Sequence, residues 1–165
     1  MTPADVPAVV AIEALSFPSG AALSESLPTP EQRFYEELSR PWTEAWVARD
    51  EGGKAVAFLL AWVVADEMHV LHLATHPAER RRGIGAELVA AAVSFARSNR
   101  TRQLLLEVRR SNEGAKRLYR AAGFFVSRVR RSYYADGEDA IEMSLLLDPG
   151  TGEVLARVDE ARVDA

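Results

Sequence analysis

Residues 73–86 read LATHPAERRRGIGA, the most informative run in the chain. A short apolar segment ends at Thr75, three consecutive arginines occupy 80–82, and Gly83 and Gly85 stand where an amphipathic segment begins. The start of a helix presents free N–H groups and a positive dipole end, both of which favour phosphate, and glycine lets a backbone approach a pyrophosphate closely. The run therefore predicts a phosphate-binding loop between a strand and a helix.

Two common nucleotide-binding patterns are excluded in this run. No Gly-Lys-Ser/Thr follows, so it is not a Walker loop, and Leu88 stands where a Gly-x-Gly-x-x-Gly fingerprint needs its third glycine. A glycine-rich helix start with arginines on its surface is the plain structural alternative.

Hydrophobic periodicity on both sides of the run predicts an α/β fold. Helices are expected at residues 5–15, 31–39, 83–96 and 112–122, the last stopped by Gly123 in the left-handed C-cap position. Strands are expected at 45–49, 55–64, 69–75, 104–108, 124–129 and 140–147, the first three as an antiparallel meander. The order of elements from 69 to 129 favours a mixed, mostly antiparallel sheet with helices on both faces. Residues 1–149 are expected to form one domain, with a polar C-terminal tail at 150–165.

The charge of the chain is small in sum and uneven in distribution. The 165 residues include 20 Lys and Arg against 24 Asp and Glu, and no cysteine. Residues 78–131 hold 14 basic and four acidic side chains, a net of +10, which leaves −14 for the rest. This block predicts an anionic ligand, either a phosphorylated small molecule or a nucleic acid, with a solvated helix face as the alternative. Without cysteine, disulfides, a thiolate nucleophile and cysteine-ligated metals are excluded.

The sequence predicts neither a membrane segment nor a metal site. The longest apolar run, Ala55–Ala65, has 11 residues, fewer than the roughly 20 that span a bilayer. Met1–Ala11 does not resemble a signal peptide, so a cytoplasmic location is expected. His69, His72 and His76 are spaced to converge on a helix, but they lie along an expected strand. No bound metal is therefore predicted.

Several motifs in the sequence resemble those of a known family. Arg80-x-x-Gly83-x-Gly85 resembles the Arg/Gln-x-x-Gly-x-Gly/Ala signature with which GNAT acetyltransferases bind the pyrophosphate of acetyl-CoA. The segments downstream are similar to the RimI type of GNAT enzyme, which acetylates the N-terminal alanine of a ribosomal protein. They are Leu106-Glu107-Val108-Arg109, Ser111-Asn112, Leu118-Tyr119, Gly123-Phe124 and Arg130-Arg131-x-Tyr133-Tyr134. The resemblance covers about residues 5–147 and implies a GNAT-like fold and acetyl transfer from acetyl-CoA to the N-terminal α-amine of a protein or peptide.

The resemblance also implies two catalytic residues. Glu107 matches the general base, acting directly or through a water, and Tyr119 matches the general acid that protonates the departing CoA thiolate. Glu107 lies in an apolar strand, where we expect removal from water to make its carboxyl a stronger base. The alternatives are a Glu107 that faces solvent or pairs with Arg109, and a Tyr119 that only packs.

Binding residues follow from the same resemblance. Those matched to acetyl-CoA are Leu73, Ala74, Thr75, Arg80, Arg81, Arg82, Gly83, Ile84, Gly85, Ala86 and Asn112. Asn112 could instead only cap the helix that follows it. Those expected to line the acceptor site are His72, Tyr133 and Tyr134. A cationic acceptor would be favoured by nearby acids, unless these only form a solvated surface: Glu36, Glu37, Asp136, Glu138, Asp139 and Glu142.

The sequence departs from the RimI pattern in three places, two of which fall in the expected acceptor loop: Ser19, and a stretch at 20–30 that is longer than expected. Only four residues precede Asp5, so the usual first strand is nearly missing and the sheet edge there could be open. Phe17-Pro18 is followed by Ser19 where the family usually has Trp. The competing functions are therefore a GNAT enzyme acting on a small-molecule amine and, more remotely, a non-catalytic module that binds nucleic acid through the basic block.

Overall fold

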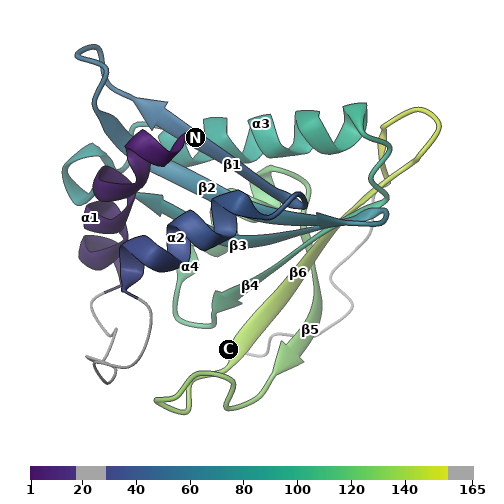
Figure 1. Cartoon of the computed structure of the whole chain (residues 1–165). Coiled ribbons are helices and arrows are strands. Elements are labelled where there is room, and N and C mark those ends of the chain that lie inside the picture. The colour runs from purple at the N-terminus through teal and green to yellow at the C-terminus, as the bar shows by residue number, and fades with distance from the viewer. Residues whose placement is uncertain (18–28, 156–165) are drawn as a thin grey trace. The chain divides into compact units, whose positions relative to one another are not determined.

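The computed structural model describes residues 1–17 and 29–155 (Figure 1). Its α-helices are α1 (Val6–Ser16), α2 (Pro30–Ser39), α3 (Ile84–Ser98) and α4 (Glu113–Ala121), and two short 3-10 helices are η1 (Pro3–Asp5) and η2 (Pro77–Glu79). Its strands are β1 (Thr43–Arg49), β2 (Ala55–Val64), β3 (Glu67–Thr75), β4 (Gln103–Arg109), β5 (Phe125–Arg130), β6 (Ala140–Leu147) and β7 (Val154–Leu155). Every helix and strand expected from the sequence is present. No helix among the described residues is long and apolar enough to cross a membrane.

Local sequence signals explain where the helices begin and end. Thr29 caps α2, because its hydroxyl accepts from the amide of Gln32 at 3.2 Å while the Gln32 side chain accepts from the amide of Thr29 at 2.7 Å. After α4, Gly123 has φ +97°, the left-handed conformation that ends helices. The predicted glycine stop is therefore confirmed.

The strands follow the order β1-β2-β3-β4-β6-β5, and β7 pairs with β6. β3 and β4 are parallel, whereas β1 with β2, β4 with β6, β5 with β6 and β6 with β7 are antiparallel. The parallel pair is the one joined through a helix, as a crossover connection requires. The expected mixed, mostly antiparallel α/β fold is confirmed. The C-terminal tail differs from expectation, because Val154–Leu155 adds a strand beside Leu146–Leu147.

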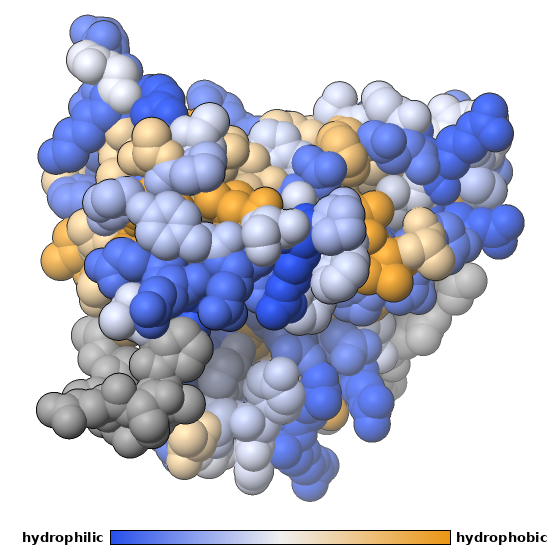
Figure 2. Space-filling view, in the orientation of Figure 1, coloured by the Kyte–Doolittle hydropathy of each residue, from blue (hydrophilic) through white to orange (hydrophobic). Residues whose placement is uncertain are grey.

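The described chain contains two compact units, and β2, β3 and α3 contribute residues to both. The first comprises Met1–Trp62 and His72–Leu88, the second Val63–Leu71 and the chain from Val89 onward. In the first unit α1 and α2 lie side by side (Figure 1) and pack on β2. Phe34 of α2 meets Phe58 of β2 edge to face, with ring centroids 5.6 Å apart. The outward side of α2 is hydrophilic (Figure 2), so this helix buries one face only.

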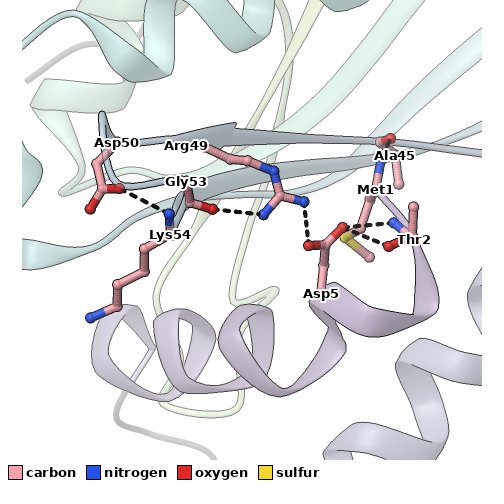
Figure 3. A network of polar contacts seen from close by, with 8 residues as sticks. All are labelled: Met1, Thr2, Asp5, Ala45, Arg49, Asp50, Gly53 and Lys54. Atoms are coloured by element: carbon pink, nitrogen blue, oxygen red, sulfur yellow. Dashed lines mark hydrogen bonds and ion pairs between the residues drawn. The ribbon is translucent and has the colours of Figure 1, made fainter.

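A polar network ties the N-terminal segment to β1 (Figure 3). The Met1 ammonium donates to the carbonyl of Ala45 at 2.9 Å, and Asp5 accepts from Arg49 at 2.5 Å and from the amide of Thr2 at 2.8 Å. Burial alone would raise the pKa of Asp5, but the hydrogen bonds from Thr2 and Arg49 prevail and lower it. This segment thus contacts the edge strand at which the sequence suggested an open edge.

In the second unit, register places polar side chains on one face of the sheet. Glu107 of β4 lies opposite Glu142 of β6, which in turn lies opposite Arg128 of β5. The intervening residues of β4 and β6 are apolar and buried: Leu104, Leu106, Val108, Ile141, Met143 and Leu145. Because side chains alternate between faces along a strand, one face of β4-β6-β5 is core and the other carries charge.

Candidate active site

The predicted phosphate loop follows β3 in the first unit. His76 caps η2 by accepting from the amide of Ala78 at 3.3 Å, so that the chain turns directly after the strand. Arg80 donates from Nε to the carbonyl of Thr75 at 3.2 Å and from Nη2 to Ser16 Oγ at 3.3 Å. Arg82 pairs with Glu79. The side chain of Arg80 therefore joins the ends of β3 and α1, a structural role that its position in the motif did not indicate.

The backbone of the same loop has the conformation of an anion site. Arg81 and Gly83 have φ +66° and +86°, and α3 begins at Ile84. Reversals of this kind align successive N–H groups into anion-binding nests. The first two amides of α3 need an acceptor from outside the helix, whereas the amide of Ala86 already donates to the carbonyl of Gly83 at 2.9 Å. A Cβ placed on Gly83 would meet nothing within 4 Å, so the surface beside it is open. The residues at 81–85 thus fit a pyrophosphate through their backbone amides, and the predicted amide contact of Ala86 is not supported.

His72 lies on the unit-1 part of β3, between α1 and α2. Its Nδ1 is 3.3 Å from Glu13 Oε1, and its ring centroid lies 6.2 Å from that of Phe34. Burial lowers the pKa of His72, which favours the neutral imidazole. Most of the loop between α1 and α2, including Pro18 and Ser19, lies outside the described residues.

Glu107 does not have the apolar surroundings expected from its strand. Its side chain is 30% exposed, and its Oε1 is ion-paired with Nη1 of Arg130. Tyr133 also hydrogen-bonds to this carboxylate, and that bond is the main reason why the pKa of Tyr133 is raised. The expectation of burial was wrong because Glu107 occupies the polar face of β4, between the inward-facing Leu106 and Val108. The sequence suggested Arg109 as an alternative ion-pair partner of Glu107, but the partner in the structure is Arg130.

Tyr119 is buried, in contrast to Glu107. It is 7% exposed, and its ring lies 5.7 Å from that of Phe124 between centroids. Burial, with a smaller contribution from Tyr134, raises the pKa of Tyr119 well above its ordinary value. The phenol is therefore protonated at neutral pH and available as a proton donor.

The two tyrosines expected at the acceptor lie in a connection between β5 and β6 that is anchored to β4. Arg109 Nη1 lies 2.8 Å from Asp136 and 2.7 Å from Glu138, and its guanidinium stacks over Tyr134, 3.9 Å from the ring centroid. The hydroxyl and amide of Ser111, followed by Arg109, lower the pKa of Glu138 to about 2. The structure thus places Glu107, Tyr133 and Tyr134 in one cluster.

Sequence reasoning missed the partners that hold this cluster. Arg109 and Glu138 are 29 positions apart, and no local spacing links them. The resembling motif contained Arg130 and Arg109 but gave no sign of their carboxylate partners. Several acids expected to attract a cationic acceptor are in fact engaged by the chain itself. Asp136 and Glu138 pair with Arg109, Asp139 pairs with Arg110, and Glu37 pairs with Arg40.

Asn112 serves as the N-cap of α4. Its Oδ1 accepts from the amide of Ala115 at 3.1 Å, which is the capping alternative that the sequence left open. The side-chain amide N–H groups are not needed for this bond, so a ligand role stays compatible with it.

Among the residues that the structure describes, no group of three His, Asp or Glu side chains could hold a metal ion. His69 Nε2 lies 3.0 Å from Glu67 Oε2, and His69 and His72 therefore have different partners.

Comparisons with known proteins give the chain its relatives. Residues 7–124 match the model of the acetyltransferase (GNAT) family. The ribosomal protein bS18-alanine N-acetyltransferase of Escherichia coli (strain K12) is 36% identical over 119 residues, which cover 64% of this chain and 80% of that protein. The N-alpha-acetyltransferase of Sulfurisphaera tokodaii is 30% identical over 136 residues, 74% of this chain and 80% of that protein. The crystal structure of the ribosomal-protein-S18-alanine N-acetyltransferase from Escherichia coli matches with a TM-score of 0.74 and 28% identity, covering 97% of this chain and 94% of that one.

Proposed function

The chain belongs to the acetyltransferase (GNAT) family, and from this premise we propose that it transfers the acetyl group of acetyl-CoA to the N-terminal α-amine of a protein. The relatives named for the N-terminal alanine of ribosomal protein S18 support a ribosomal protein as the acceptor. Acetyl-CoA is the co-substrate, and the amides at 81–85 would hold its pyrophosphate. Leu73–Thr75 and the side chain of Asn112 remain its proposed further contacts.

An α-amine is a chemically favourable acceptor for a weak base. The pKa of an α-amino group is near 7.7–8.0 and that of Lys is near 10.4, so at neutral pH the free amine is on the order of a hundred times more abundant for a chain terminus. A carboxylate such as Glu107, acting directly or through a water, then suffices to remove the remaining proton.

The reaction needs two proton transfers, and the chain offers one group for each. Glu107 would accept the proton that the attacking amine loses as the new N–C bond forms at the acetyl carbonyl. Tyr119 would donate its proton to the CoA thiolate as the C–S bond breaks. Its burial keeps the phenol protonated in the free enzyme, so that the proton is in place when the C–S bond breaks. Direct transfer of this kind needs no cysteine, and the chain has none.

One observation carries the proposal of a peptide acceptor: Tyr133 is held against the carboxylate of the proposed base, and Tyr134 packs on Tyr133. Tyr133 hydrogen-bonds to Glu107, and its ring lies 5.3 Å from that of Tyr134, nearly perpendicular to it. Paired aromatic side chains beside a base offer a wall along which the first residues of a peptide can lie.

A competition among acceptors tests the proposal. Alanine-initiated peptides, the same peptides with a blocked N-terminus and an internal lysine, a polyamine and an aminoglycoside are incubated with acetyl-CoA, and the products are measured by mass spectrometry. Acetylation is expected on the free N-terminal alanine alone. Acetylation of the small amines without that of any peptide would establish the small-molecule alternative instead.

A further inference from the structure

The proposed base is already bound to a cation of its own chain. Nη1 of Arg130 contacts Oε1 of Glu107, and the same guanidinium stacks over Tyr133, 4.4 Å from the ring centroid. Tyr133 completes the group by hydrogen-bonding to Glu107. Arg130 and Glu107 are 41% and 30% exposed, so the pair can be reached from solvent.

A second arginine on the same face, Arg109, is held by more carboxylates than Arg130 is. Arg109, two residues along β4 from Glu107, contacts two carboxylates and covers the ring of Tyr134. Within the described ranges, 1–17 and 29–155, Arg130 has one carboxylate partner, which is Glu107. When that partner is taken away, the ring of Tyr133 still offers Arg130 a cation–π contact. The cation–π contact therefore does not depend on the ion pair with Glu107.

The acceptor and Arg130 compete for one carboxylate. A protonated α-amine is a cation that carries the proton to be removed, and it reaches the base by the same charge-assisted hydrogen bond that Arg130 now makes. A carboxylate has about four lone-pair sites, and the contacts from Arg130 and Tyr133 occupy part of them. An amine or a bridging water can therefore use Glu107 fully only after Arg130 has moved aside.

We propose that Arg130 is a positioning residue that masks Glu107 in the free enzyme and is displaced by the cationic N-terminus of the acceptor. The inference rests on the proposed function and adds one requirement to it: each acceptor has to break the ion pair between Arg130 and Glu107 in order to bind. A neutral or poorly placed amine does not displace the guanidinium, so the mask favours cationic N-termini that dock correctly.

The test measures peptide affinity separately from turnover. An alanine-initiated peptide is titrated calorimetrically into enzyme saturated with CoA, and KM and kcat are then measured with acetyl-CoA. An exposed ion pair is worth little, so Arg130→Gln is expected to lower the peptide Kd and KM about two- to fivefold. Arg130→Lys, which keeps the cation, is expected to restore most of the wild-type Kd.

Arg128→Gln is the matched control. Arg128 lies on the same strand and the same face, opposite Glu142, and its replacement removes one positive charge without touching Glu107. Removing any positive charge from the enzyme reduces its repulsion of a cationic peptide and is expected to lower the peptide Kd slightly. An equal gain in Arg128→Gln would therefore overturn the proposal, and so would a peptide Kd that rises or stays unchanged in Arg130→Gln.

A double variant isolates the pair itself. In a Glu107→Gln background, Arg130→Gln is expected to lower the peptide Kd no more than Arg128→Gln does, because no carboxylate remains to be masked. A gain of the same size in this background would contradict masking. Failure of the proposed function looks different from any of these results, because then no peptide is bound or acetylated by the wild-type enzyme either.

Discussion

Glu107 and Tyr119, for which the roles of base and acid are proposed, have opposite surroundings. The carboxylate is exposed and reachable by an amine or a water, whereas the phenol is buried and firmly protonated.

Replacing either group should slow chemistry and spare binding of the donor. Glu107→Gln and Tyr119→Phe are each expected to lower kcat by roughly a hundredfold or more while the Kd of acetyl-CoA stays nearly unchanged, since general acid–base catalysis contributes factors of this size. Initial rates and calorimetry measure the two quantities. Glu142→Gln, on the strand beside Glu107, is the control and should keep most activity. Wild-type turnover in both variants would remove the assignment.

Glu138 makes the anchoring of the tyrosine connection depend on pH. Its pKa is about 2 in the folded protein and about 4.3 in an unfolded chain. Because the folded value is the lower one, its contribution to stability is fully present above about pH 4.3 and is lost as the pH falls toward 2.

The thermal stability of Glu138→Gln should reflect this sign. The variant is expected to melt below the wild type at pH 7, with a Tm difference that shrinks between about pH 4 and pH 2. Melting curves of both proteins at matched pH provide the measurement. Glu51→Gln, in the exposed turn between β1 and β2, should show no such trend. A difference that grows as the pH falls would refute the role given to Glu138.

The loop before α3 is proposed to bind acetyl-CoA through its backbone amides. A substitution of its glycine at 83 should therefore affect the affinity for acetyl-CoA. Gly83 has φ +86° and Gly53, in the turn between β1 and β2, has φ +81°, and an added Cβ at either would meet nothing within 4 Å. The two substitutions to alanine therefore share one cost, the left-handed strain of about 1 kcal/mol.

Only the substitution at Gly83 should affect the affinity for acetyl-CoA. Gly83→Ala is expected to raise the Kd of acetyl-CoA about tenfold or more, because a shift of the nest misaligns several amides at once. Gly53→Ala should lose similar stability and keep wild-type affinity. Denaturant unfolding and calorimetry compare the pair, and equal donor affinity in both variants would exclude the backbone site.

The elements of this chain were predictable where local signals act alone. The run at 55–64 and the stop at Gly123 needed only hydrophobic pattern and backbone preference, and both are confirmed. The face of β4 on which Glu107 lies was not predictable, because Leu104–Val108 reads as an apolar run until pairing with β6 separates its two sides. The added strand at Val154–Leu155 was missed for a different reason, because two residues carry no period.

Over the whole chain, the fold and family followed from several motifs in order, whereas the partner of each charge did not. An ion pair between strands depends on register, and register is a property of the assembled sheet. Arg130 therefore could not be assigned to Glu107, nor Arg109 to Asp136 and Glu138, before the strands were in place.

The net charge of +10 over residues 78–131 is consequently a poor guide to nucleic acid binding. Carboxylates already engage five of its arginines: Arg82, Arg102, Arg109, Arg110 and Arg130. Binding to a nucleic acid backbone needs several free cations and weakens steeply with salt. In a filter-binding assay we expect negligible retention of DNA or RNA at 150 mM salt, and any retention at low salt should fall when acetyl-CoA occupies the phosphate loop. Tight retention that acetyl-CoA does not disturb would instead point to a nucleic acid surface elsewhere on the basic block.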